Sequence, residues 1–304
     1  MLTHRMIRQL SILIPTRNDV CLPQVETLQH MASSIEGLNY EILVSDDASD
    51  DPDVIQQNDK INSLEHCALL RQKENRGRAA NRNILAQKAQ FPWLLFLDCN
   101  VKINDTDFLV KYLNQDQVEV VNGGIFAETD DELSHHNLRY QYEKKIEPKH
   151  VAAQRQQRPY QSFRTSNFMA QREVMLAHPF DETLKGYGYE DVLFGKTLCD
   201  QGISISNIDN PVMMTHFESN EGYVTKVEDA MCTLHKLRKE LSGYSPLLAT
   251  VEKLEKWHLI TLYKLFFKVF SKSIRRKLTG TKPSIKWLNP YKLGYYLSIE
   301  SQSE

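Results

Sequence analysis

The sequence predicts an α/β protein with a mostly parallel central sheet flanked by helices, followed by a helical C-terminal extension. Three observations support this fold class. Short apolar runs alternate with helical segments through the first two thirds of the chain, and polar clusters follow several of those runs. From about Tyr223 the pattern changes to long segments with apolar residues three and four positions apart. Alternating strands and helices are typical of a parallel sheet with crossover helices.

The expected strands share a short apolar run with polar or turn-forming flanks. They are residues 10–15, 40–45, 67–70, 93–97, 163–169 and 212–216, with a strand or turn at 122–126. Helices are expected at 22–35, 79–90 and 192–201. We place a domain boundary after residue 222, so that 1–222 is the α/β domain and 223–304 the helical extension.

Polar residues follow three of these strands. Arg17 comes after the first, Asp46 and Asp47 end the second, and Asp98 and Asn100 follow the strand at 93–97. A solvated loop explains any one cluster. All three together favour a ligand site, because ligands of parallel sheets bind at the carboxyl ends of the strands.

Two adjacent carboxylates, Glu190 and Asp191, follow the glycine- and tyrosine-rich segment 186–189. Glycine permits tight bends, and a carboxylate in an aromatic, partly closed pocket is a suitable general base. The alternative is an acidic first helical turn, which the helix dipole favours without any chemistry.

Composition excludes several classes. The 304 residues are 41% hydrophobic and 25% charged, with a formal net charge of -2, which argues against general nucleic-acid binding. Five cysteines without a CxxC pair indicate neither a disulfide framework nor a zinc cluster, so a cytoplasmic location is expected. Residues 1–5 lead into a polar stretch, so no signal peptide is expected.

Asp98, Asn100 and His216 are the candidate metal ligands. Each follows a predicted strand or ends one, and oxygen and nitrogen donors with open positions suit Mn²⁺ or Mg²⁺. A single histidine at a strand end is more often structural than a ligand, so the alternative is a site without His216.

Helices are also expected at 226–241 and 247–278. The second segment combines aromatic and apolar residues with eight lysines and arginines. This pattern fits a helix on an anionic membrane surface, or equally a helix packed on the catalytic core with a solvated basic face. The basic segment 140–158 is either a solvated helix and loop or a mobile lid that meets phosphates.

Five motifs in this order resemble family 2 inverting glycosyltransferases. They are residues 11–18, 44–51, 75–78, 81–83 and 96–100. The resemblance covers residues 10–220, and the segment 186–195 with His216 is similar to galactosyl- and N-acetylgalactosaminyl-transferring relatives. It implies a GT-A fold, a Rossmann-like nucleotide-binding half and a nucleotide-sugar donor, most often a UDP-sugar.

The same resemblance implies roles for individual residues. Pro15 and Arg17 border the nucleoside, Asp46 hydrogen-bonds the uracil edge, and Arg78 lies near the base or the phosphates. Asp98 contacts the ribose and the metal region.

The acidic motif departs from the family pattern. The family's usual Asp-x-Asp is Asp98-Cys99-Asn100 here, so the principal metal ligand is a neutral amide and His216 carries more of the metal binding. Arg164 and Asn167 line the sugar or acceptor pocket on this reading.

The predicted activity is inverting transfer of a Gal, Glc, GalNAc or GlcNAc-type sugar from a UDP-sugar to a glycan or lipid-linked oligosaccharide. Asp191 is the general base, Glu190 positions the acceptor or a loop, and a divalent metal binds the diphosphate. The partners are the donor, the acceptor and an anionic membrane contacted through 247–278, at the inner face of the cell membrane.

Two alternatives come from other classes. One is a degenerate nucleotide-sugar-binding or scaffold protein, because the Asp-x-Asn motif is weakened. The other is a nucleotidyltransferase, which is disfavoured because the loop at 15–19 lacks the glycines of a triphosphate loop.

Overall fold

The computed structural model describes residues 6–300, and the N-terminal residues on which the signal-peptide prediction depends lie outside this range. The chain divides into two compact units. The sheet unit runs up to Phe126 and includes Lys149–Lys185 and Thr197–His216. The helical unit comprises Ala127–Pro148, Gly186–Lys196 and the chain from Phe217 onward.

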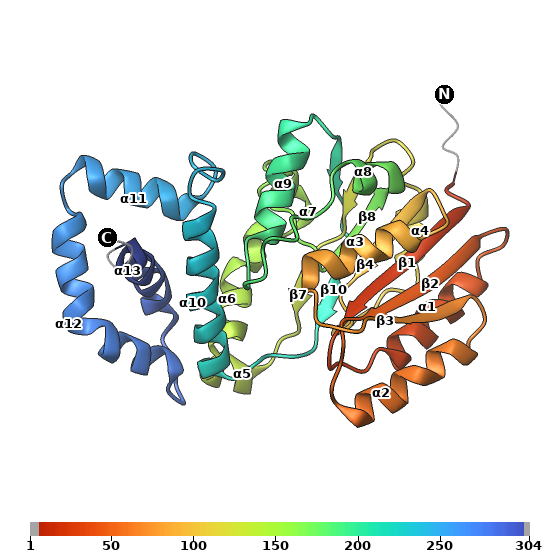
Figure 1. Cartoon of the computed structure of the whole chain (residues 1–304), viewed down its shortest axis with the longest axis horizontal. Helices are drawn as coiled ribbons and strands as arrows, with labels where there is room; N and C mark the ends of the chain where they lie inside the picture. Colours follow the sequence, from red (N-terminus) through yellow and green to blue (C-terminus); the bar gives the residue numbers. More distant parts are fainter. Residues whose placement is uncertain (1–5, 301–304) are drawn as a thin grey trace. The chain divides into compact units, whose positions relative to one another are not determined.

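The sheet unit is built on seven strands in the order β3-β2-β1-β4-β8-β6-β9 (Figure 1). Their bounds are β1 Gln9–Thr16, β2 Asn39–Asp46, β3 Cys67–Arg71, β4 Trp93–Leu97, β6 Val120–Asn122, β8 Asn167–Gln171 and β9 Ile205–Asn207. The first four pair in parallel, β8 is antiparallel to β4 and to β6, and β6 pairs in parallel with β9. This arrangement confirms the predicted fold class.

The parallel strands form because their apolar runs are buried on both faces. Leu10, Ile12, Leu13 and Ile14 of β1 are all fully buried. Strands covered by helices on both sides read as continuous hydrophobic runs rather than alternating ones. The core of β1 is shared with helices α1 (Leu22–Ser33) and α4 (Phe108–Leu113), while α3 (Arg78–Lys88) packs against β1 and β2.

A small second sheet joins β5 (Val101–Lys102), β10 (Val212–Met214) and β7 (Ile125–Ala127). Met214 pairs with Val101, so the loop after β4 runs beside the end of β10. The segment predicted as a strand or turn at 122–126 is both, with Gly124 in a left-handed conformation between β6 and β7.

The remaining elements are mostly short. Before the C-terminal helices they are α1 Leu22–Ser33, α2 Pro52–Asp59, η1 Lys60–Ser63, α3 Arg78–Lys88, α4 Phe108–Leu113, α5 Asp131–His136, α6 Leu138–Ile146, η2 Glu147–Lys149, α7 Ala152–Gln156, α8 Arg172–Ala177 and α9 Glu190–Asp200.

The C-terminal helices are α10 Asn220–Lys236, α11 Pro246–Lys256, α12 Ile260–Thr279, η3 Ile285–Trp287 and α13 Leu288–Glu300. Figure 1 shows α13 enclosed by α10, α11 and α12. Their core includes Val224 and Val227 of α10, Phe267 and Leu278 of α12, and Tyr291 of α13.

The boundary of the helical unit differs from the predicted division after residue 222. The unit also takes in 127–148 and 186–196, because Leu138 of α6 shares the buried cluster with Tyr223 and Val224 of α10. Contacts between segments so far apart in the chain produce no local sequence pattern, so this division could not be predicted from the sequence.

The prediction of one helix over 247–278 is wrong. The structure has two helices, and α11 ends where His258 adopts a left-handed conformation at φ 54°. The Leu259 amide bonds the Leu254 carbonyl and the His258 amide bonds that of Glu255, the pairing of a Schellman motif. Within residues 6–300 no helix has the length and apolar character needed to cross a membrane.

Candidate active site

Strands β1, β2 and β4 end at the same edge of the sheet. Thr16 at the end of β1 lies opposite Asp46 at the end of β2. The Thr16 hydroxyl also lies 3.4 Å from the Cys99 sulfur, in the loop after β4. The three polar clusters singled out in the sequence are therefore neighbours in the sheet unit.

Asp46 and Asp47 hold the loops at this edge. One Asp46 oxygen accepts hydrogen bonds from the Ser49 amide and hydroxyl, and the other accepts one from Arg71. Asp47 accepts from the amides of Arg76 and Gly77 at 2.7 and 2.8 Å. Both aspartates are buried. For Asp46 to bind a base it would have to give up one of these internal partners.

Arg17 lies in the exposed loop that follows Pro15 and the end of β1. Its guanidinium is 4.0 Å from the Asp50 carboxylate, a weak interaction because both groups are solvated. Asn18 beside it, with φ 55°, is bonded firmly to Asp50 in both directions at 2.8 and 3.0 Å. The loop is therefore fixed while the Arg17 charge faces solvent.

Arg78 begins helix α3 directly after Gly77. Gly77 caps the helix at φ 92°, a conformation that favours glycine, and Arg76 and Arg78 on either side are exposed. Two cations at a helix N-terminus create a local positive potential that suits a phosphate group.

Arg82 is a site residue that sequence reasoning missed. Its guanidinium is buried and donates to the Asp98 carboxylate at 2.9 Å, with the Phe180 ring 5.8 Å away. The other guanidinium nitrogens, Nε and Nη1, are buried without a hydrogen-bond acceptor among the described residues. A buried cation is costly unless paired, so Arg82 and Asp98 depend on each other.

Asn81 and Asn83 flank Arg82 and are equally buried. Asn81 donates to the Ser45 carbonyl at the end of β2, and Asn83 exchanges two hydrogen bonds with the backbone of Phe180. Three consecutive polar residues buried in one helix are unusual. This triplet was the signal in the sequence that could have identified Arg82.

The loop before Glu190 is strained and tightly packed within the helical unit. Gly188 and Tyr189 have φ values of 82° and 68°. A Cβ on Gly188 would lie 2.9 Å from the Ala230 Cβ, and one on Gly186 would lie 2.8 Å from the Thr233 hydroxyl. Backbone strain of this kind persists only where packing imposes it, and it clusters at functional sites.

Glu190 and Asp191 form the first turn of α9. The Asp191 carboxylate accepts a hydrogen bond from the Val192 amide at 2.8 Å, and the Leu193 amide bonds the Tyr189 carbonyl. Burial raises the pKa of the Tyr189 phenol, so it remains a protonated, neutral neighbour. Glu190 and Asp191 can form an acidic first helical turn while Asp191 also acts as a base, because the helix N-terminus stabilises the charged form of either carboxylate.

The sequence also matches a known protein family. The family model described as Glycosyl transferase family 2 matches residues 11–178, more than half of the chain. The chain belongs to glycosyl transferase family 2. The matched region contains every predicted donor-site residue, and a search of curated proteins gives no match.

One solved glycosyltransferase structure supports the fold assignment, and two others are less similar. The mannosyltransferase PcManGT from Pyrobaculum calidifontis, in complex with GDP-Man and Mn²⁺, has a TM-score of 0.55 at 14% identity, covering 99% of this chain and 87% of that one. TarS residues 1–349 from S. aureus give 0.49 at 14% identity, covering 97% and 92%. GalNAc-T7 with UDP, GalNAc and Mn²⁺ gives 0.46 at 16%, covering 73% and 48%.

The three candidate metal ligands of this glycosyltransferase lie on adjacent loops of the sheet unit. The Thr215 hydroxyl, next to His216, donates to the Asn100 carbonyl at 3.0 Å. Within residues 6–300 no group of three His, Cys, Asp or Glu side chains is arranged to hold a metal. One carboxylate, one amide and one imidazole fit a cation that takes its other ligands from a diphosphate and water.

Asn167 has a structural environment. Its amide is buried, donates to the carbonyls of Gly124 and Asn210, and accepts a 2.6 Å hydrogen bond from Tyr112. Like Asp46, Asn167 would have to give up one of these internal partners to contact a donor. Arg164 is half-buried just before β8.

Arg155 shows that the basic segment 140–158 is not simply solvated. Its buried guanidinium donates to Asn122, Asn207 and the carbonyls of Gly123 and Ile208, at 2.7 to 3.0 Å. A Cβ on Gly124 would lie 2.7 Å from this guanidinium. Arg155 therefore anchors residues 149–158 to the sheet, which argues against a lid formed by this part of the segment.

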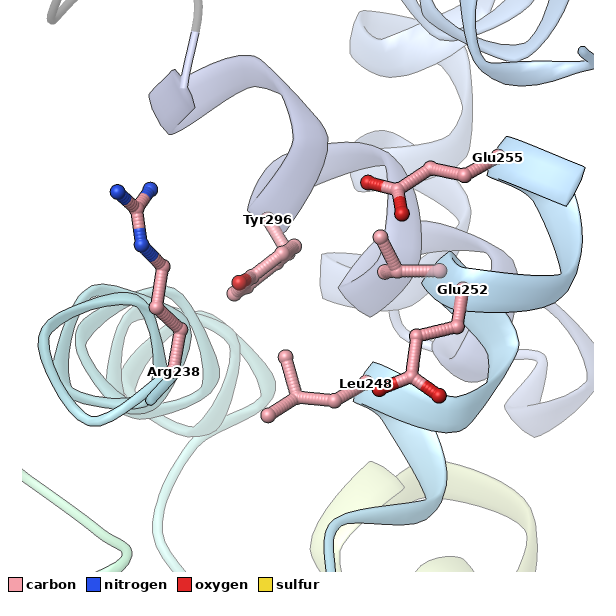
Figure 2. A pocket seen from close by; sticks show the side chains of 6 residues that line it. Arg238, Leu248, Glu252, Glu255 and Tyr296 are labelled. Carbon is pink, nitrogen blue, oxygen red and sulfur yellow. The ribbon is translucent and has the colours of Figure 1, made fainter. Parts of the chain in front are cut away.

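A cavity of about 330 Å³ lies within the helical unit (Figure 2). It is lined by Arg238, Leu248, Val251, Glu252, Glu255 and Tyr296. None of the candidate site residues is among them, so this cavity gives no support to the donor or acceptor predictions.

Proposed function

We propose that this family 2 enzyme is an inverting glycosyltransferase that uses a UDP-sugar. It would transfer a sugar of the Gal, Glc, GalNAc or GlcNAc type to a hydroxyl group of a glycan or a lipid-linked oligosaccharide. The observation that carries the proposal is the edge where β1, β2 and β4 end, at which Asp98 is held by the buried Arg82.

The donor site would use Pro15, Arg17, Asp46, Arg78, Asp98, Arg164 and Asn167. Arg17 and Arg78 are exposed cations of the sheet unit, which suits a ligand with two phosphates. The preference for uridine rests on the resemblance of the motifs, and the test below therefore includes other nucleotides.

Asp98, Asn100 and His216 would hold a divalent cation, Mn²⁺ or Mg²⁺, whose charge would offset that of the departing diphosphate. Their placement on adjacent loops supports this assignment. The Arg78 guanidinium would contribute positive charge to the same leaving group.

Asp191 would act as the general base. As the acceptor oxygen attacks the anomeric carbon, its proton passes to the Asp191 carboxylate and the bond from that carbon to the diphosphate oxygen breaks. Inversion follows from one such displacement. Glu190 would position the acceptor or the glycine–tyrosine loop. The strained backbone before Glu190 and its packing on α10 support a functional loop.

Two observations favour a second candidate, a nucleotide-sugar-binding protein without activity. Asn100 is neutral, and the Asp98 charge is already compensated by Arg82. Both features weaken the attraction for a cation.

Nucleotide release from a panel of UDP- and GDP-sugars, with Mn²⁺, Mg²⁺ or chelator, tests the proposal. Wild type should consume one donor, and Asp191→Asn should lose about 100-fold or more in rate while donor binding stays unchanged. Asp200→Asn, in the last turn of the same helix, is the matched control. Donor binding without turnover under all these conditions would favour the binding protein instead.

The acceptor and the location remain predictions from the sequence. A lipid-linked acceptor would place the enzyme at a membrane surface, and contact through residues 247–278 is part of the same proposal.

A further inference from the structure

Exposed apolar side chains concentrate on one part of the helical unit. Eight large hydrophobic residues are exposed in the described part of the chain, and six of them lie between residues 257 and 270. We call these six the outer face of α12; they are Trp257, Leu259, Leu262, Leu265, Val269 and Phe270, with exposed fractions between 37% and 64%. An apolar cluster of this kind marks an interaction surface.

The outer face lies on a different side of α12 from the residues that pack against the other helices of the helical unit. Phe267, Ile274 and Leu278 are buried against the neighbouring helices. Leu262, Leu265 and Val269 are spaced three and four residues apart, which places them together on the side of α12 away from Phe267. A Cβ on Gly294 of α13 would overlap the Phe267 ring, so this packing fixes the orientation of the helix.

The turn between α11 and α12 adds Trp257 and Leu259 to the same surface. Its Schellman hydrogen bonds and the left-handed His258 define its backbone. Trp257 is 64% exposed, although an indole ring normally buries much of its area. A fixed turn that presents a tryptophan to solvent is suited to an apolar, partly hydrated partner.

The positive charge of α12 indicates that the partner of the outer face is anionic. Helix α12 carries six lysines and arginines and no acidic residue, whereas the whole chain has a net charge of -2. Arg275 pairs with Glu221 and Glu228. Of the other five cations, Lys264, Lys268 and Lys272 lie beside the apolar row. Among the described residues these three lysines form no ion pair.

We propose that the outer face of α12 lies in the interfacial layer of a membrane rich in anionic phospholipids. Apolar side chains would enter the acyl boundary while the flanking lysines contact lipid phosphates. The sequence left open whether segment 247–278 packs on the protein or meets a membrane. The structure shows α12 packed through one face with a second apolar row still exposed, which supports both roles together.

A second copy of the chain is a poorer partner for this face. A two-fold interface brings the same surface of both copies together, so the lysines of two outer faces would meet. Juxtaposed like charges oppose such an association.

The inference rests on the proposed function only for its acceptor, because a lipid-linked saccharide explains why the enzyme would bind a membrane. Vesicle binding is measured without donor or acceptor. Failure of one experiment therefore leaves the other intact.

The test is co-sedimentation of the full chain with vesicles of phosphatidylcholine alone or mixed equally with phosphatidylserine. Wild type should bind the mixed vesicles and lose binding at high salt. Leu262→Ser with Val269→Ser should weaken binding about 100-fold, and Lys264→Gln with Lys268→Gln about tenfold. On binding, Trp257 emission should shift to the blue, and Trp257→Phe should lose that shift.

The matched control is Val151→Ser with Leu176→Ser, which should bind like wild type. These are the other two exposed large hydrophobic residues among those described. Circular dichroism verifies that each variant is folded. Folded wild type that fails to bind mixed vesicles would overturn the proposal. A dimer that Leu262→Ser with Val269→Ser converts to monomers, with no vesicle binding, would assign the face to a second copy.

Discussion

The two units surround their cations with partly different partners. In the sheet unit, Arg155 and Arg82 are held by carbonyl, amide and carboxylate oxygens at 2.7 to 3.0 Å. In the helical unit, Arg139 and Lys226 pair with the Glu143 and Glu218 carboxylates at 2.8 and 2.9 Å. Cations there also lie over aromatic rings: Arg139 over Tyr223, Lys226 over Tyr187, Lys277 over Trp287 and Lys292 over Tyr142, at 4.7 to 5.3 Å.

This difference has physical consequences. Hydrogen bonds to oxygen are directional and fix both partners, whereas a ring face attracts a cation over a range of positions. The hydrogen bonds of the sheet unit therefore fix the loops of the proposed donor site. In the helical unit we expect Lys277 and Lys292, which lie over rings, to tolerate substitution better, and we expect the loop at 186–189 to depend on backbone packing.

Arg155 gives the largest expected effect of this difference. Arg155→Met would leave several buried carbonyl and amide oxygens without donors, at a cost of about 4 kcal/mol in unfolding free energy. Arg158→Met removes an exposed arginine of the same segment and should change stability little. Denaturant unfolding measures both. If both variants lost a similar amount of unfolding free energy, the hydrogen bonds from Arg155 to buried oxygens would not account for the stability of the sheet unit.

Variants of Arg82 test whether the hydrogen bonds of the buried arginines also support the proposed donor site. Arg82→Ala should cost about 3 kcal/mol, because Asp98 loses its partner and a cavity remains. Donor-dependent activity should fall about 10- to 100-fold, as for other residues that orient a ligand-binding group. Arg82→Lys keeps the charge but not the guanidinium geometry. If its KM for the donor matched wild type, the geometry of the Arg82–Asp98 pair would be irrelevant.

Gly188 tests the helical unit's reliance on backbone packing. Gly188→Ala must accept φ 82° and a Cβ close to Ala230, with an expected loss of about 2 kcal/mol. Gly202→Ala is the control, since it has φ 68° but open space around its Cβ. The difference between the variants in thermal unfolding isolates the packing contribution. Gly188→Ala should also lower kcat more than donor affinity.

The strands and their polar ends could be predicted because each signal is local. Continuous apolar runs predicted β1 to β4, and the polar residues after them were found at one sheet edge. Arg82 was missed because its partner Asp98 is contributed by a different element, and a charged helix residue reads as exposed. The break at Trp257–Leu259 was missed because His258, rather than glycine, takes the left-handed position.

Helix α13 was also missed, for reasons that lie in its composition. Pro290 and Gly294 both disfavour a helix in a sequence-based analysis. Pro290 stands in the first turn, where its missing amide costs little. Gly294 provides the space that the Phe267 ring occupies. The presence of these two residues in a helix is explained only by the structure, in which α12 packs against α13.

Lys292 provides the smallest effect and the most direct test of how the helical unit holds cations. It lies over the Tyr142 ring without an ion pair among the described residues, and burial, with Arg139 nearby, lowers its pKa to about 8. The unfolded chain, with a lysine pKa near 10.4, therefore binds more protons than the folded protein between about pH 8 and 10. Because of this difference the unfolding free energy should rise with pH across that window.

Lys292→Met retains the apolar stem and removes the charge, so it should abolish the rise and stabilise the protein at pH 7. Lys286→Met, which changes an exposed lysine close in sequence, is the control and should leave the pH dependence of unfolding unchanged. Denaturant unfolding at pH 7, 8, 9 and 10 compares the three proteins. A Lys292→Met profile parallel to that of wild type would mean that the ring and its surroundings hold the Lys292 cation as well as water does. Aromatic faces would then equal oxygen acceptors as partners for buried charge in this protein, and the contrast between the two units would disappear.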